Sequence, residues 1–470
     1  MAASSTSKPA PGVTTGPVGV LPWLDRATEV LVYAMVVFSP WAFGTTQPWA
    51  IAWMNAGGYT LGGMLLVKIW LRRAPAEQPE KTRANGLVTA LLAVTFGILG
   101  YVLLSAVNAE FTYLPTEWRQ EPHPHVEWLP HSLDRLASWR VFWNWLALAG
   151  TFWVARDWLL GEGASEGPLR MRRLRRLIFV LAGNGALLAL QGILQRFSGT
   201  PLLLWFKATH DNPMAEAQFG PYAYRSNAAQ FFNLIWPVAL GLWWMSQSRR
   251  REQGHKWMLP CVMLLAAGAL VSMSRGGAGV AVVQMGAAVL ILLAGGASGW
   301  RVRLGLGIVL CATLGAAFYF GWEQLAQRLE TGSVDPLAGR SETYQLAARM
   351  TVDYPWFGVG PGAFDTVFQL YRNAPGDYWP AQLHNDWLEY LITFGRAGGA
   401  LLLAAVALLA GRWFMPGGLR LPWTFVALIW VALLGCLLHA RFDFPLQIYS
   451  IQFVCVLLGA ILFSGSKRGA

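Results

Sequence analysis

The sequence predicts an all-α integral membrane protein with about twelve transmembrane helices. Hydrophobic residues make up 55% of the chain and charged residues only 13%, and the mean hydropathy is +0.39. Apolar runs of roughly 18 or more residues recur, and each is long enough to cross ~30 Å of hydrocarbon as a helix. The predicted spans are 28–46, 50–71, 85–107, 139–158, 177–195, 229–247, 257–273, 278–298, 304–321, 387–410, 421–438 and 447–464.

Basic residues between these runs predict the orientation. Most of the 36 Lys and Arg residues fall in alternate loops, including the clusters Arg170–Arg176 and Arg249–Arg251. Such clusters stay on the cytoplasmic side of a membrane. We therefore expect both termini in the cytoplasm, with residues 1–24 as a disordered tail. The net charge of +11 follows from this topology and does not indicate nucleic-acid binding.

A long polar segment interrupts the apolar pattern between the ninth and tenth predicted helices. Helices 1–9 are expected within 25–321, a partly helical periplasmic loop at 322–386, and helices 10–12 with a short cytoplasmic tail at 387–470. So long a polar insert in an apolar chain indicates a function, and we expect it to carry the catalytic residues. Three other outward segments are predicted at 108–138, 196–228 and 272–277.

The first outward segment contains three histidines, His123, His125 and His131, among several glutamates. A metal site is one interpretation, but neighbouring prolines would break a helix that aligned these ligands, which favours a solvated loop. The four cysteines all lie inside apolar runs, and the chain contains no Asp-x-Asp motif. We therefore expect neither a metal nor another cofactor.

Two arginines lie at predicted helix starts without an acidic neighbour in the adjoining sequence. Arg275 follows Ser274 and precedes Gly276 and Gly277, and Arg225 follows the segment that starts at Gly220. An arginine near the apolar zone needs water or a partner. Snorkelling to lipid headgroups is one interpretation, and binding of a phosphate group is the other.

The order of several motifs resembles the O-antigen ligase and polymerase superfamily of bacterial envelope glycosyltransferases. The order is Ser274-Arg275-Gly276, Gly339-Arg340, a Pro-x-x-Gly-x-Gly-Pro-Gly-x-Phe run over 355–364, His384-Asn385, and Arg441-Phe442-Asp443-Phe444-Pro445. The resemblance covers about residues 220–450. The stretch 220–227 departs from the family pattern, which leaves the roles of Arg225 and Asn227 open.

The resemblance implies transfer of a glycan from undecaprenyl diphosphate, a polyprenyl diphosphate, to a hydroxyl of lipid A–core. It implies His384 as general base, because a histidine titrates near envelope pH. Arg275 and Arg340 match the family's diphosphate-binding arginines, and arginine forks can replace a metal on phosphate oxygens. Arg225, Asn385, Arg441 and Asp443 are candidate supporting residues. The implied enzyme is metal-independent and inverting, and it lies in the bacterial inner membrane with its active site facing the periplasm.

Two other functions remain open from the sequence. A polymerase of the same superfamily would add the glycan to a second lipid-linked glycan, and the acceptor site that distinguishes it is not evident in one sequence. A transporter would bind the lipid diphosphate without chemistry. The functional charges gather on one predicted face, which favours chemistry on that side, and the helix count favours the ligase.

Overall fold

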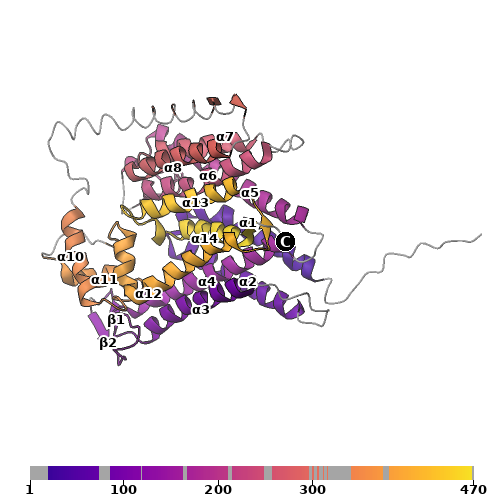
Figure 1. Cartoon of the computed structure of the whole chain (residues 1–470). Coiled ribbons are helices and arrows are strands. Elements are labelled where there is room, and N and C mark those ends of the chain that lie inside the picture. Colours follow the sequence, from indigo (N-terminus) through magenta and orange to yellow (C-terminus); the bar gives the residue numbers. More distant parts are fainter. Residues whose placement is uncertain are drawn as a thin grey trace, which may run out of the picture.

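The chain folds into a bundle of helices, shown in a computed structural model (Figure 1). The structure describes residues 20–72, 85–117, 119–161, 167–209, 214–247, 257–295, 299–300, 340–373 and 381–467, and scattered helical residues between 304 and 315. Residues 1–19 of the predicted tail fall outside this part of the chain. Most of the predicted span 304–321 and residues 316–339 and 374–380 also fall outside it.

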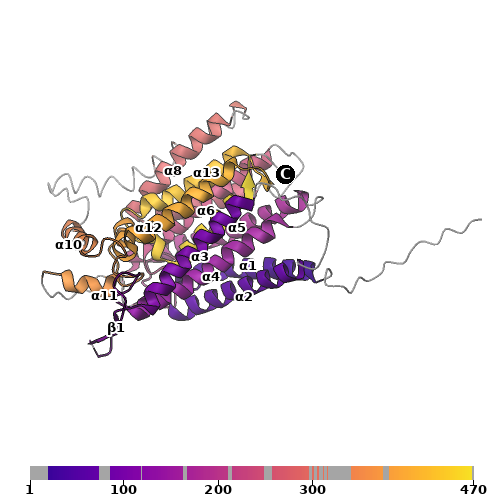
Figure 2. The same ribbon diagram turned by 60° about the horizontal axis from the view of Figure 1, so that its bottom comes forward.

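Each predicted apolar run within the described part coincides with a helix. The helices are α1 (Leu21–Trp41), α2 (Pro48–Arg72), α3 (Asn85–Val107), α4 (Arg135–Leu160), α5 (Gly167–Ser198), α6 (Arg225–Gln247), α7 (Met258–Val271), α8 (Arg275–Ala294), α12 (Asp386–Gly411), α13 (Trp423–His439) and α14 (Tyr449–Ser464). Many of them run side by side (Figure 2). The bundle is therefore mostly helical, as the composition predicts.

Four of the described helices are long and apolar enough to cross a membrane. They are Gly86–Val107, Pro168–Ser198, Arg275–Ala294 and Asp386–Phe414. Large apolar side chains on the outer helices are exposed, among them Leu66, Phe96 and Leu403. An apolar exterior of this kind suits contact with lipid. The structure thus agrees with an all-α membrane protein, while the full number of twelve spans remains a prediction.

Two helices differ clearly from their predicted bounds. Helix α5 begins at Gly167, whereas its run was expected to start at 177. The first run was expected at 28–46, but α1 begins at Leu21 and ends at Trp41. Gly44 has a φ of +66° in the turn that follows, and a Cβ there would lie 2.5 Å from the Tyr222 ring. The close approach of Tyr222 therefore requires a glycine and a turn where the apolar pattern alone predicts more helix.

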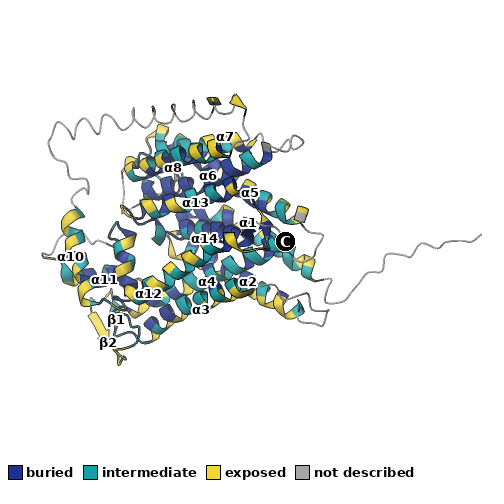
Figure 3. Ribbon diagram, viewed as in Figure 1, coloured by how far each residue is buried: buried dark blue, intermediate teal, exposed yellow. Residues whose placement is uncertain are grey.

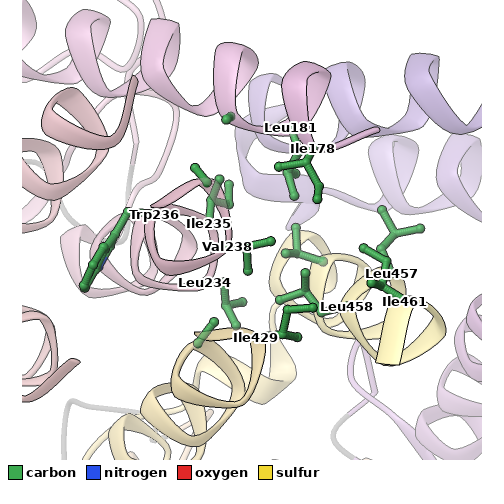
Figure 4. Close-up of a cluster of buried hydrophobic side chains, with 14 of the residues drawn as sticks. Ile178, Leu181, Leu234, Ile235, Trp236, Val238, Ile429, Leu457, Leu458 and Ile461 are labelled. Atoms are coloured by element: carbon green, nitrogen blue, oxygen red, sulfur yellow. The ribbon is translucent and has the colours of Figure 1, made fainter. Parts of the chain in front are cut away.

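The core lies among α5, α6, α13 and α14. Figure 4 shows Ile178 and Leu181 of α5, Leu234 and Val238 of α6, and Leu458 of α14 meeting in it. Nearly every residue of α6 is buried, and α6 contacts α5, α7, α8 and α13. The dark blue centre of Figure 3 follows these helices, whereas the outer helices expose more residues. Helix α6 is therefore a rigid central element, and its first turn faces the site described below.

Charged side chains cluster at the end of the bundle that carries the C-terminus. Lys68 of α2 is fully buried and lies 2.6 Å from Asp25 of α1 and 3.6 Å from Asp157 of α4. Arg173 of α5 also pairs with Asp25. These residues flank loops that the basic clusters predict to be cytoplasmic. The alternation of loops between the two ends is therefore consistent with the predicted topology.

The opposite end carries the polar segments (Figure 1). A hairpin of β1 (Phe111–Leu114) and β2 (Arg119–Pro122) pairs Phe111 with Pro122, and it lies near α10 (Arg340–Asp353) and α11 (Phe364–Phe368). Leu133 N donates to Val359 O at 2.9 Å, which joins the first outer segment to the long loop. A second short pair, β3 (Leu419–Arg420) and β4 (Gly465–Ser466), lies near the C-terminus.

Glycines fix the loop between α10 and α11, as the sequence predicts. Gly358, Gly360 and Gly362 have φ values of +69°, +102° and +80°, in the region that favours glycine. A Cβ on Gly360 would collide with Ser132, and one on Gly358 would collide with the carbonyl oxygen of Ile392 in α12. The glycines therefore shape and pack this loop.

Gly358→Ala is predicted to destabilise the protein. The positive φ alone costs an alanine about 1–3 kcal/mol, and the clash with Ile392 adds to this cost. We expect a lower Tm in detergent for the purified variant. Gly399→Ala is the matched control, because Gly399 is helical in α12 and has no atom within 4 Å of its would-be Cβ. Equal Tm values for both variants would contradict the packing role of Gly358.

Candidate active site

His384 occupies a constrained backbone position immediately before α12. Its φ is +56°, which is uncommon for a residue other than glycine. The Tyr344 hydroxyl of α10 donates to the His384 carbonyl oxygen at 2.8 Å. Residues held in this way often belong to functional sites, because the surrounding structure must stabilise the strained conformation. The fold therefore fixes the direction of this histidine.

His384 pairs with Asp443 from the loop between α13 and α14. The two atoms, His384 Nδ1 and Asp443 Oδ1, are 3.0 Å apart. An ionised carboxylate only accepts hydrogen bonds, so His384 Nδ1 is the donor and Nε2 is the ring nitrogen left for another partner. The ring packs against Phe444 with centroids 4.7 Å apart and against Tyr224 at 5.9 Å. The arrangement orients an imidazole for proton abstraction.

The surroundings of Asp443 keep its carboxyl group ionised. Burial by itself raises the pKa of Asp443, but the hydrogen bond with His384, the nearby His439 and the hydroxyl of Ser226 outweigh burial. The pKa therefore lies below its ordinary value. The Phe444 backbone N–H also donates to Asp443 Oδ1 at 3.0 Å. A buried, ionised aspartate behind a histidine stabilises the imidazolium that forms when the histidine takes a proton.

A buried polar network lies behind Asp443. Ser226, in the first turn of α6, donates to Asp443 Oδ2 and lies 3.0 Å from His439 Nε2. His439 Nδ1 is 2.9 Å from Gln230 Oε1, and the Ser274 hydroxyl donates to Ser226 at 3.2 Å. Helices α6, α8 and α13 thus converge on one carboxylate. Such a network fixes the carboxylate through several elements at once.

The start of α12 is bonded directly to the loop that carries Asp443. The Asp386 N–H donates to Ala440 O at 2.8 Å and to Asp443 O at 3.2 Å, and the Asp386 carboxylate accepts from Leu446 N at 2.7 Å. Asn385 caps α12 through Leu388 N at 3.2 Å. Asn385 therefore has a structural role here, since its side-chain oxygen serves as the helix cap.

Arg340 lines the same cavity as His384. It is the first residue of α10, and its guanidinium donates to Phe442 O at 3.0 Å. Burial raises the pKa of both Tyr224 and Tyr344, and the nearby Arg340 cation partly offsets each rise. Arg340 is thus close to the phenols that border His384. Its position brings a fixed positive charge next to the His384–Asp443 pair.

The other predicted arginines lie around this pair. Arg275 is exposed at the start of α8, next to Ser274, whose side chain caps that helix through Gly277 N at 3.1 Å. Arg225 donates to Glu216 O at 2.9 Å within its own loop. Arg441 is exposed and lies over the Phe442 ring. Arg340 is thus brought close to His384, whereas Arg225 is engaged elsewhere.

The buried polar network behind Asp443 also explains why a glycine follows Arg275. A Cβ on Gly276 would lie 2.9 Å from His439 Nε2. The start of α8 therefore approaches the buried histidine closely, which only a residue without a side chain permits. This contact brings the backbone at Arg275 beside the network behind Asp443.

Two cavities meet at His384. The smaller one, of about 420 Å³, is lined by Arg340, Arg372, Glu342 and other residues of the long loop. The larger one, of about 850 Å³, is lined by residues from α4, α6, α12 and α14. Gln382 and His384 line both. The histidine can therefore act on groups that lie in either cavity, and the two arginines give only the smaller one a cationic wall.

Several site residues escaped the sequence analysis. Tyr224, Ser226, Tyr344 and Arg372 were not among the candidates, although the first two belong to the stretch 220–227 that was singled out. A clear signal existed for Ser226, because it lies in the first turn of a helix next to a motif arginine. Nothing in the sequence pairs it with Asp443, more than 200 positions away.

The histidines of the first outer segment lie apart from this site. His123 Nε2 is 2.7 Å from Thr112 Oγ1, and His131 Nδ1 is 3.0 Å from Leu129 O. His125 lies 3.8 Å from Glu110. Within the described ranges, no group of three or more His, Cys, Asp or Glu residues is arranged to hold a metal ion. The three histidines are thus engaged within their own loop.

Comparison with protein families supports the predicted resemblance. Residues 260–403 match the family described as O-antigen ligase, a range that contains Arg275, Arg340 and His384. The match confirms the predicted resemblance to the O-antigen ligase superfamily over this part of the chain. It points to a membrane enzyme of the glycosyltransferase type. Ser226 and Asp443 lie outside the matched range, and a search of curated proteins found no match.

The lowered pKa of Asp443 predicts how stability depends on pH. A carboxyl group with a depressed folded pKa contributes stability fully above its unfolded pKa of about 3.9, and loses it as the pH falls through the folded value. The Tm difference between wild type and Asp443→Asn should therefore stay constant from pH 8 to 5 and shrink only at more acidic pH. A difference that already declines between pH 7 and 5 would contradict this.

Asp365 provides a control, because its effect on stability should change with pH in the opposite direction to that of Asp443. Burial raises the pKa of its carboxyl group, so the ionised form destabilises the fold at neutral pH. Wild type should therefore gain stability relative to Asp365→Asn as the pH falls through the raised pKa. The same thermal unfolding series measures both variants.

Proposed function

We propose that this protein is a ligase-type glycosyltransferase that moves a glycan from undecaprenyl diphosphate to a hydroxyl of lipid A–core. The observation that carries the proposal is the His384–Asp443 pair at the junction of the two cavities, with Arg340 on the cationic side. The superfamily match, which spans the histidine and both predicted arginines, supports the same chemistry. The proposed site faces the periplasm of the bacterial inner membrane.

The proposed step is a direct displacement at the anomeric carbon. The acceptor oxygen forms a bond to this carbon while the bond to the phosphate oxygen breaks. The acceptor proton passes to His384 Nε2, and the bonding electrons leave with the lipid diphosphate. Attack from the face opposite the leaving group inverts the anomeric centre. A positioned general base of this kind contributes about 10²–10⁴-fold to the rate.

The arginines would act on the leaving group. Departure of the lipid diphosphate develops negative charge, which fixed cations in a cavity stabilise without reorganisation. Arg340 and Arg372 line the smaller cavity and are the nearest candidates, and Arg275 is the second arginine that matches the family motif. Guanidinium forks fit phosphate oxygens at any working pH. We propose that this chain needs no divalent metal for the transfer.

The first test is transfer by His384→Ala in detergent with EDTA present. The donor is an undecaprenyl-diphosphate glycan and the acceptor is rough lipopolysaccharide. We predict that the variant loses about 10²–10⁴-fold in rate while it remains folded, which its thermal unfolding transition checks. His125→Ala is the matched histidine control and should keep the wild-type rate, because His125 lies in the first outer loop.

The outcomes separate the candidate functions. Transfer to lipopolysaccharide that disappears in His384→Ala supports the ligase. Chain growth on a second lipid-linked glycan, offered in a parallel reaction, would make the protein a polymerase. Full activity of the variant would overturn the role of His384 as base. Binding of the lipid diphosphate without transfer to either acceptor would indicate a transporter.

Arg340 is tested through the donor. Arg340→Ala should raise the donor KM by roughly 10–100-fold, because a charge-assisted hydrogen bond contributes about 1.5–3 kcal/mol. Arg340→Lys should restore part of this loss, since lysine keeps the charge but not the planar fork. Arg349→Ala, on an exposed position of the same helix, is the control. An unchanged donor KM in Arg340→Ala would remove Arg340 from the diphosphate site.

A further inference from the structure

The larger cavity differs in chemistry from the smaller one. Its described lining contains no Lys or Arg. It is instead rich in amides and phenols, with one indole and one carboxylate, which are Gln47, Asn144, Asn227, Gln382, Gln447, Gln452, Trp145 and Glu389 with four tyrosines. Carboxamides and hydroxyls both donate and accept hydrogen bonds, and an indole ring offers an apolar face. This combination suits a neutral, hydroxyl-rich ligand.

Asn227 is the residue in this lining that most clearly lacks a partner. It is the third residue of α6 and only 4% exposed, yet its side chain makes no hydrogen bond to any residue that the structure describes. The preceding residue, Ser226, is hydrogen-bonded to Asp443, and Gln230 on the next turn is bonded through its Oε1 to His439. Since Asn227 lines the cavity, a ligand there can supply the missing bonds.

Trp145 and the tyrosines give the cavity walls a defined shape. The Trp145 ring stacks on Phe394 with centroids 5.0 Å apart and an interplanar angle of 13°. The Tyr390 hydroxyl donates to Leu446 O at 3.1 Å, and Gln452 Nε2 donates to the same oxygen at 2.6 Å. The walls are therefore fixed by their own packing before any ligand binds. A preformed polar pocket loses little entropy when it takes a ligand.

The position of His384 assigns the two cavities to the two substrates. In a direct displacement, the nucleophile and the leaving group lie on opposite sides of the anomeric carbon. The arginines attract the leaving diphosphate into the smaller cavity, so the attacking hydroxyl comes from the other side. The larger cavity is the other described space that His384 lines, so a hydroxyl held there lies within reach of the base.

We infer that the larger cavity is the acceptor subsite, that it binds an uncharged sugar, and that Asn227 hydrogen-bonds a hydroxyl of that sugar. This inference rests on the proposed function and adds the acceptor's chemical class and a specificity residue. A polyprenyl tail is a poorer occupant, because it would leave the amide of Asn227 without a partner. A phosphorylated sugar is disfavoured as well, since the described residues of the lining supply no guanidinium or ammonium group.

The test separates acceptor binding from donor binding. Initial rates are measured with purified full-length protein in detergent, first varying rough lipopolysaccharide with a neutral terminal sugar and then varying the undecaprenyl-diphosphate glycan. Asn227→Ala should raise the acceptor KM roughly tenfold, as expected for a lost hydrogen bond, and leave the donor KM within about twofold. Asn108→Ala is the matched control, because Asn108 bonds only within the first outer loop.

A second variant keeps the test valid if Asn227→Ala folds poorly. Gln452→Met nearly preserves the side-chain volume of a cavity residue on α14 and should also raise the acceptor KM selectively. A raised donor KM with an unchanged acceptor KM in both variants would overturn the inference while the proposed function stands. If the donor KM depends on the length of the prenyl chain in wild type but not in the variants, the cavity binds the lipid tail. This result would also overturn the inference. Absence of transfer by wild type would instead overturn the proposed function itself.

Discussion

The hydrogen bond between His384 and Asp443 is the interaction on which the rest of the site depends. It joins a residue at the start of α12 to one between α13 and α14, and each partner is held by further bonds. Tyr344 binds the His384 backbone, and Ser226 binds the Asp443 carboxylate. Because an ionised Asp443 requires a proton on Nδ1, this one contact sets the direction and the protonated ring nitrogen of the imidazole.

The division of charge around this pair follows from the fold. The long loop brings Arg340 and Arg372 to one side of His384, whereas α4, α6, α12 and α14 bring neutral amides and aromatic rings to the other. In the proposed reaction, the diphosphate and the acceptor sugar therefore meet different walls of one site. The scaffold that holds these walls is the buried core around α6, whose first turn also supplies Ser226 and Asn227. Helix α6 therefore both supports the core and supplies two side chains of the site.

Much of the fold could be predicted because apolar runs long enough to cross a membrane form helices. Runs such as 85–107 match their helices, while α1 departs from its prediction where Gly44 must make room for Tyr222. The site was predictable only through the family resemblance, which singled out His384 and Asp443 separately. Their pairing, and the contribution of Ser226 to it, depends on contacts between segments far apart in the sequence. Periodicity and composition carry no information on such contacts.

The central claim is that Asp443 orients His384 for proton abstraction, and Asp443→Asn tests it most directly. Single-turnover transfer from the undecaprenyl-diphosphate glycan would be measured across pH 5–9 for wild type, Asp443→Asn and His384→Ala. The account predicts that Asp443→Asn keeps donor binding but loses at least about 10²-fold in transfer rate, approaching His384→Ala. A wild-type rate and pH profile in Asp443→Asn would contradict the account.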